Sequence, residues 1–253
     1  LLIRQDQSTG YAATYLPDTP EMIIPHYAIR GLMFRWIIVF YSISFCVNTV
    51  ADINLTSLDK NGIKLWESKA FSKKSLYTLE LNRDRLALKA VSNASASGLV
   101  LKKKIDLSET PYMSWSWLIE KTLFPLVERS KEGDDFVTRI YVVIDGGFMF
   151  WKTLSLNYVW SSNQEKDLVW DNPFAGSNVK MMSIRGKGSQ TGQWYDERRN
   201  VYEDLIQVFG DKGSEEENRE AYGQIDVVAI MTDTDNSGKQ AESYYGDIIF
   251  STE

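Results

Sequence analysis

The sequence predicts an all-β protein built as a single β-sandwich of the jelly-roll type, with one short amphipathic helix. From residue 76 onward, apolar and polar residues alternate in short segments bounded by turn residues, which is the pattern of strands. One longer stretch instead shows helical spacing. No internal repeat and no Pro-, Gly- or Ser-rich linker divides the chain, so we expect one domain of about 200 residues.

Nine segments carry the alternation of a strand. We expect strands at 76–81, 85–92, 98–106, 112–119, 136–144, 151–161, 178–185, 224–232 and 243–251. In the segment "YMSWSWLIE", Met113, Trp115, Trp117 and Ile119 fall on one face. Such an apolar stripe is typical of the face that a sheet turns toward the core.

The helical exception is the stretch "WYDERRNVYEDLIQVFG" at residues 194–210. Val201, Leu205 and Phe209 recur there at helical spacing, and Gly210 stands where a helix would end. We therefore expect one amphipathic helix over 194–210, packed against a sheet. The segments 120–135 and 210–223 are expected to be loops.

The N-terminal part has the anatomy of a secretory signal peptide at residues 33–51. Arg35 precedes an apolar run that is interrupted by serines, and small residues end it at Ala51. The run is short for a membrane span, although an uncleaved anchor is the alternative. We expect an upstream or disordered extension at 1–32, a signal peptide at 33–51 and the β-sandwich domain at 52–253, with no stable membrane span after cleavage.

The chemistry open to the exported chain is narrow, because Cys46 and His26 are the sole Cys and His of the sequence and both precede the cleavage point. This excludes Ser-His-Asp and Cys-His catalysis, disulfides and the usual zinc sites from the mature chain. The formal net charge of −6 is spread along the sequence, so no nucleic-acid partner is expected. What remains is chemistry by carboxylates, Lys, Arg, Tyr, Ser or a hard metal.

The loop "DTDNSG" at residues 233–238 offers spaced oxygen ligands for calcium. It is not an EF-hand, because Tyr244 stands where that loop needs a closing Glu and because no helix pattern flanks it. Asp233 and Asp235 either join a further carboxylate, such as Asp247, around a structural calcium ion or simply hold a turn between two strands.

A second group of polar residues is Asp134, Asp135 and Arg139 in "EGDDFVTRIYVVID". Two carboxylates beside a guanidinium are suited to a sugar or a cation. The structural alternative is that one Asp caps the turn while Arg139 makes an ion pair.

A third group combines aromatic and charged side chains: Tyr158 and Trp160 in one strand, with Trp194, Glu197 and Arg199 near the expected helix. Aromatic rings beside planar polar groups have the composition of a sugar-binding surface, because pyranose rings stack on them. Each ring taken singly also fits the core.

A polysaccharide hydrolase or lyase would need two carboxylates across a cleft, at a separation that the sequence does not give. The candidates for such a pair are Asp134, Asp135, Glu197 and Asp204.

Several segments resemble an uncharacterised family of secreted bacterial proteins, domain of unknown function 3047. They are "SASGLVLKKKIDLSETPYMSWSW", "KEGDDFVTRIYVV", "NYVWSS", "WYDERRNV", "IMTDTDNSG" and "YYGDIIF", in order over residues 62–251. The resemblance implies a periplasmic or secreted protein of a Gram-negative bacterium and brings no activity with it.

The last segment, "YGDIIF", is also similar to the final strand of jelly-roll, galactose-binding-like carbohydrate-binding modules. There an acidic residue, at Asp247 in this chain, helps to hold a structural calcium ion. That likeness implies a second carboxylate in the first strands, for which Glu67 is the candidate.

We therefore expect an exported cell-envelope β-sandwich that binds carbohydrate or another envelope ligand without catalysis. The alternatives are a polysaccharide-acting enzyme with a carboxylate pair and a structural or accessory protein-interaction component.

Overall fold

The computed structural model describes residues 50–58 and 62–253. The expected extension at 1–32 and nearly all of the expected signal peptide at 33–51 lie outside the described residues. The domain boundaries drawn from the sequence therefore stay predictions. Within the described part of the chain, neither helix has the length and apolarity needed to cross a bilayer.

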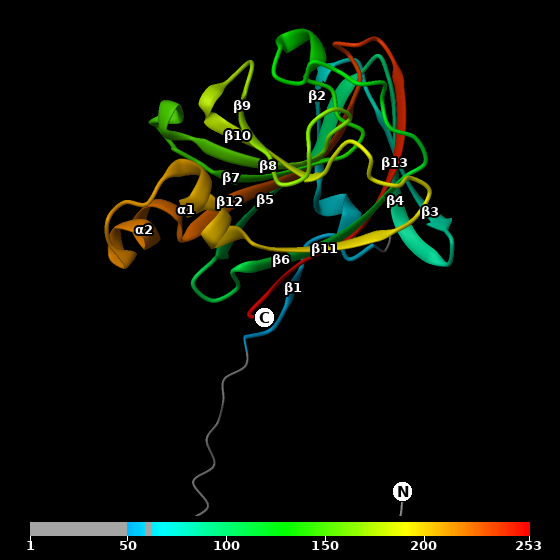
Figure 1. The fold of residues 1–253 in the computed structure, drawn as a ribbon. Helices are drawn as coiled ribbons and strands as arrows, with labels where there is room; N and C mark the ends of the chain where they lie inside the picture. The colour runs from blue at the N-terminus through cyan, green and yellow to red at the C-terminus, as the bar shows by residue number, and fades with distance from the viewer. Residues whose placement is uncertain (1–49, 59–61) are drawn as a thin grey trace, which may run out of the picture. The chain divides into compact units, whose positions relative to one another are not determined.

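Two sheets face each other (Figure 1). The first sheet contains, in spatial order, β11 (Tyr195–Asn200), β6 (Tyr112–Ile119), β13 (Gln240–Ser251), β4 (Arg85–Asn93) and β3 (Leu76–Asn82), with β1 (Ile53–Asn54) also paired to β13. The second sheet contains β2 (Glu67–Ser72), β5 (Ala96–Asp106), β12 (Gln224–Asp233), β7 (Arg139–Ile144), β8 (Leu154–Trp160), β10 (Gly176–Arg185) and β9 (Val169–Asn172). The pairing is antiparallel except between β8 and β10.

The predicted all-β sandwich is confirmed, and each of the nine expected strands has a counterpart; β6 has the expected ends, and the other eight differ at one end or both. Four strands were missed. They are β1, β2, β9 and β11. β1 and β9 are very short, and β2 is exposed along most of its length, so none of the three shows a clear buried alternation.

The predicted helix at 194–210 is wrong in its first part. Residues 195–200 form β11, which pairs with β6, and the helix α1 spans Val201–Phe209. The Asn200 side chain caps this helix by accepting a hydrogen bond from the Glu203 N–H. Gly210 follows the last residue, as predicted.

The expected loop at 210–223 contains a second helix, α2 (Glu215–Tyr222). Ser214 caps this helix by accepting a hydrogen bond from the Glu217 N–H, and its hydroxyl donates to the Glu217 carboxylate at 3.0 Å. The buried Tyr222 ring fixes the helix to the sandwich. Figure 1 shows α1 and α2 together at one end of the sandwich. Three short 3-10 turns complete the described elements, at Gly62–Leu65, Lys131–Gly133 and Phe150–Lys152.

The core between the sheets is rich in aromatic rings. Met113, Trp115, Trp117 and Ile119 all face it, as the stripe in "YMSWSWLIE" predicted. The Trp115 ring of the first sheet stacks on the Tyr158 ring of the second, with centroids 5.3 Å apart. These rings join the two layers and hold the outer face of each sheet in place.

Candidate functional site

The outer face of the second sheet carries a polar cavity. Along β7, Ile140 and Val142 point into the core, so Arg139 and Tyr141 point to the opposite face. Asn157 of β8 lies opposite Tyr141 in the register and shares that face. The cavity measures about 460 Å³. We call it the acidic pocket; its lining residues are Phe71, Ala96, Asp134, Arg139, Tyr141, Asn157, Asn172, Phe174, Ala175, Val179, Met231, Asp233, Asp235 and Asn236.

Strand pairing explains why four carboxylates gather at this pocket. β12 and β7 are antiparallel neighbours, so the end of β12 at Asp233 lies beside the start of β7, which Asp134 and Asp135 precede. One carboxylate oxygen from each of Asp135, Asp233 and Asp235 lies within 4.8 Å of the others.

Backbone donors hold two of these carboxylates in place. Asp135 Oδ2 accepts a hydrogen bond from the Ser237 N–H at 2.6 Å, and Oδ1 accepts one from the Asn236 N–H at 3.2 Å. Asp233 Oδ1 accepts a hydrogen bond from the Phe136 N–H at 3.2 Å. The two Asp side chains therefore tie the turn after β12 to the segment before β7.

Arg139 is the cation of the pocket. Its Nη2 donates to Asp233 Oδ2 at 3.0 Å and to the Asp134 backbone carbonyl at 3.0 Å. The guanidinium also lies over the Phe136 ring, 4.4 Å from its centroid. One guanidinium thus faces several carboxylates in a largely buried setting.

The carboxyl groups are perturbed accordingly. Burial raises the pKa of Asp233 to about 8; the carboxylates of Asp134 and Asp135 add to this rise, whereas Arg139 opposes it. Burial, assisted by Asp135, also raises the pKa of Asp235. These two carboxyl groups therefore hold their protons to a higher pH than free carboxyl groups do, unless a further cation favours their ionised form.

Two exposed phenyl rings stand at the pocket. Phe71 comes from the edge strand β2 and is 65% exposed, and Phe174 comes from the turn between β9 and β10 and is 56% exposed. The polar floor between them includes the amide of Asn172, which donates to Asp134 Oδ2 at 3.0 Å. An aromatic rim over planar polar groups suits a polar ligand that also has an apolar face.

The predicted ligand-binding residues are divided among separate places. Asp134, Asp135 and Arg139 come together at or just beneath the acidic pocket. Tyr158 and Trp160 are 0% and 2% exposed in the core, so neither ring forms part of a surface. Tyr158 and Trp160 do share one face of β8, as the alternation predicted, but that face is turned toward the core.

Glu197 and Arg199 also face inward, because β11 pairs them with the core residues Trp115 and Met113. Glu197 accepts hydrogen bonds from Arg185 Nε at 2.6 Å and from Trp117 Nε1 at 3.0 Å. Arg199 Nε donates to Asp204 Oδ2 at 2.8 Å.

Trp194 is half-buried on the other side of the first sheet, where it packs with Ala87, Leu118 and Tyr244. The expected surface of Trp160, Trp194, Glu197 and Arg199 is therefore not assembled in the structure.

The predicted metal ligands are divided in the same way. Asp233 and Asp235 lie together, with Asp135 as their third member. Asp247 lies on the first sheet, where its Oδ1 accepts hydrogen bonds from Thr56 Oγ1 at 2.8 Å and from the Leu58 N–H at 3.1 Å. Glu67 is exposed at the start of β2. The sequence did not indicate that Asp135 would join Asp233 and Asp235, nor that the pocket would be lined by Phe71, Asn157, Asn172 and Phe174.

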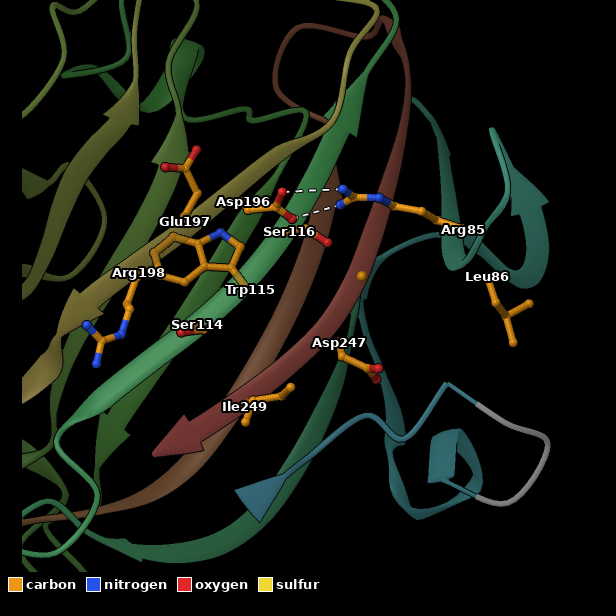
Figure 2. A pocket seen from close by; sticks show the side chains of 11 residues that line it. Arg85, Leu86, Ser114, Trp115, Ser116, Asp196, Glu197, Arg198, Asp247 and Ile249 are labelled. Carbon is orange, nitrogen blue, oxygen red and sulfur yellow. Dashed lines mark hydrogen bonds and ion pairs between the residues drawn. The ribbon is translucent and has the colours of Figure 1, made fainter. Parts of the chain in front are cut away.

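A second cavity, of about 510 Å³, lies on the outer face of the first sheet. Figure 2 shows its rim, where Arg85 Nη1 pairs with Asp196 Oδ1 at 2.7 Å. Its floor includes Ser116 and Gly246, and a Cβ at Gly246 would lie 2.0 Å from Ser116 Oγ. Trp115 contributes to the lining, but its ring is 3% exposed and packs in the core. This cavity offers no exposed aromatic ring, so the acidic pocket is the better candidate site.

The structure thus defines a β-sandwich domain with an open, acidic, aromatic-rimmed cavity on one outer face. The chain belongs to the family described as "Protein of unknown function (DUF3047)", whose match covers residues 64–249. The family resemblance of the sequence is therefore confirmed. No curated protein sequence matches the chain.

Several solved structures are similar to this chain. The family 11 carbohydrate-binding module of a Clostridium thermocellum cellulosomal cellulase shares 10% identity, with 80% of this chain and 95% of that module covered, at a TM-score of 0.42. The module CBM27-1 of Caldicellulosiruptor saccharolyticus, in complex with mannohexaose, shares 14% identity, with 81% and 99% covered, at 0.37.

The glycoside hydrolase domain of Endo-D from Streptococcus pneumoniae shares 10% identity at a TM-score of 0.36, with 74% of this chain covered. The match spans 22% of the length of that hydrolase chain. The two paired sheets of this chain themselves define it as a β-sandwich.

Proposed function

We propose that the protein binds carbohydrate in the acidic pocket without catalysing a reaction. The observation that carries the proposal is the pair of exposed rings, Phe71 and Phe174, beside a cavity floored by planar polar groups. Carbohydrate presents the matching chemistry. The C–H face of a pyranose packs on an aromatic ring, and its hydroxyls exchange hydrogen bonds with amides, carboxylates and guanidinium groups.

The floor supplies both donors and acceptors for these hydroxyls. Asn157 and Asn172 carry amides, and Asp233 and Asp235 carry carboxylates. Arg139 Nε is buried beneath the pocket and has no hydrogen-bond partner among the described residues, so the guanidinium is not fully satisfied by the protein. The size of the cavity, about 460 Å³, is within the range of small-molecule sites.

The arrangement of the carboxylates supports binding rather than hydrolysis. The two catalytic carboxyl groups of a glycosidase flank the scissile bond at about 5–9.5 Å from each other. The nearest oxygens of Asp135, Asp233 and Asp235 are all within 4.8 Å of one another, and Asp135 is buried and does not line the pocket. Asp135 and Asp233 also accept hydrogen bonds from backbone N–H groups, so both carboxylates stabilise the fold.

Calorimetry with a panel of soluble glycans tests the proposal. Phe71→Ala and Phe174→Ala should each weaken binding about tenfold, which corresponds to about 1.4 kcal/mol of lost stacking. Phe124→Ala is the matched control, because Phe124 is 52% exposed and does not line the acidic pocket. Equal losses in all three variants, or no glycan binding by the wild-type protein, would contradict the proposed site.

We also propose that the protein is exported and meets its ligand in the cell envelope. The signal-peptide pattern of residues 33–51 supports this. Expression of the full chain in a Gram-negative host, followed by fractionation and mass determination of the N-terminus, tests the proposal. Cleavage near Ala51 is expected, and retention of the intact chain in the cytoplasm would contradict export.

A further inference from the structure

We propose that Asp135, Asp233 and Asp235 bind a calcium ion beside the acidic pocket. This inference goes beyond carbohydrate binding and does not depend on it. The three side chains each place a carboxylate oxygen within 4.8 Å of the other two, which is the spacing of oxygens around one cation. They come from two segments that the pairing of β7 with β12 brings together.

Two further oxygens, in the same two segments of the chain, are buried without a hydrogen-bond partner among the described residues. One is Asp134 Oδ1, on a side chain that is 7% exposed and lines the acidic pocket. Its nearest cationic atom is Arg139 Nη2 at 3.5 Å. The other is Ser237 Oγ, in the residue whose N–H binds Asp135. Buried polar atoms are normally satisfied, so these oxygens indicate a missing partner.

The balance of charge points the same way. Asp134, Asp135, Asp233 and Asp235 bring four carboxyl groups to a region where Arg139 is the one cation that pairs with them among the residues that the structure describes. Buried carboxylates are costly unless a cation or a proton compensates them. A divalent cation would compensate two of these charges at once.

The nature of the ligands selects the cation. All candidate ligand atoms are oxygens of carboxylates or a hydroxyl, which hard cations prefer. Calcium accepts six to eight oxygens in flexible geometry, whereas magnesium demands a near-ideal octahedron. The turn at 235–238 and the fixed side chains of Asp135 and Asp233 suit the more tolerant ion.

Calcium here would join the turn after β12 to the segment before β7. Asp134 and Asn236 belong to these two segments, and both line the pocket. The ion would therefore stabilise one wall of the acidic pocket.

Titration of the chelator-treated protein with calcium chloride in a calorimeter, with no glycan present, tests the inference. We expect a dissociation constant of about 10⁻⁴–10⁻³ M, as in extracellular modules, and a higher melting temperature in millimolar calcium. Asp235→Asn should weaken calcium binding at least about tenfold, because it removes one anionic ligand. Within the described part of the chain, the Asp235 side chain makes no hydrogen bond to another residue and is only partly buried, so its substitution should leave the fold intact.

The control is Asp196→Asn, which makes the same charge change at an exposed carboxylate on the first sheet. It should bind calcium within about twofold of the wild-type protein. Circular dichroism confirms that both variants are folded. Absence of heat and of any melting shift for the wild-type protein in millimolar calcium would overturn the inference, as would equal weakening in both variants. Because glycan is absent, failure here is distinct from failure of carbohydrate binding.

Discussion

Arg139 Nη2 lies 3.0 Å from Asp233 Oδ2, and both side chains are 4% exposed. This pair joins two central strands of the second sheet beneath the acidic pocket. Breaking a buried ion pair from one side leaves a desolvated charge without a partner. The pair is therefore a requirement of the fold as well as a part of the candidate site.

Arg139→Leu should lower the free energy of unfolding by about 2–3 kcal/mol, because Asp233 and the Asp134 carbonyl would lose their buried hydrogen bonds from Nη2 and Asp233 would have to stay protonated. Urea denaturation in the presence of a chelator measures the change. Arg85→Leu provides the comparison, since the pair of Arg85 with Asp196 is 45% and 71% exposed. Its loss should cost about 0–1 kcal/mol. Similar costs for the two variants would contradict the assignment of Arg139 to a buried pair.

Tyr158→Phe should lower stability by about 1–2 kcal/mol and leave glycan affinity unchanged. The Tyr158 hydroxyl donates to Asp204 Oδ2 at 2.8 Å inside the core, and its removal leaves that oxygen with Arg199 alone. Tyr202→Phe is the control, since its hydroxyl is 3.4 Å from Glu215 at an exposed position, and it should stay within about 0.5 kcal/mol. A loss of glycan binding in Tyr158→Phe would contradict the assignment of Tyr158 to the core and would indicate that it contacts the ligand.

Gly246→Ala should destabilise the protein by about 1–3 kcal/mol, because the new Cβ would lie 2.0 Å from Ser116 Oγ in the neighbouring strand. Ser116→Ala removes that oxygen, so the double variant should recover part of the loss. A double-mutant cycle by thermal or urea unfolding should give a coupling energy above about 0.5 kcal/mol. Additive effects would show that Ser116 does not determine the need for glycine.

Glu128 should make stability fall as the pH rises. Its side chain is 0% exposed, and burial raises the pKa of its carboxyl even though Ser161 and Ser162 donate hydrogen bonds to it. A carboxyl with a higher pKa in the folded state favours folding at low pH. That contribution is lost as the pH rises from the unfolded pKa of about 4.3 through the folded value.

Glu128→Gln removes this titration. Urea unfolding of the two proteins across the acidic range should show the wild-type protein losing stability relative to the variant as the pH increases. The opposite slope would mean that the hydrogen bonds from Ser161 and Ser162 outweigh burial.

The fold was predictable from the sequence where alternation was strong, as in the stripe of Trp115 and Trp117. β11 was not, because its inward residues are charged. Glu197 and Arg199 are tolerated inside the sandwich since each has an ion partner, Arg185 and Asp204 respectively. A pattern of apolar and polar residues does not reveal such partners, so these charges were assigned to a surface.

The sequence indicated most of the charged residues of the candidate site, but it did not indicate that they would come together in one pocket. Asp134, Asp135 and Arg139 formed one predicted group, and Asp233 and Asp235 formed another. Their union depends on the pairing of β7 with β12, which joins residues 94 positions apart in the contact of Arg139 with Asp233. Local sequence signals carry no information about that register, nor about the exposure of Phe71 and Phe174.

The order of the strands also bears on how the chain becomes folded. β12 lies between β5 and β7 in the second sheet, and β13 lies between β6 and β4 in the first. Both sheets therefore receive a central strand from residues 224–251, the last part of the chain that the structure describes. Neither sheet can reach its native strand order before these residues have been made, because its middle strand is missing. A chain truncated before β12 would lack the middle of both layers at once.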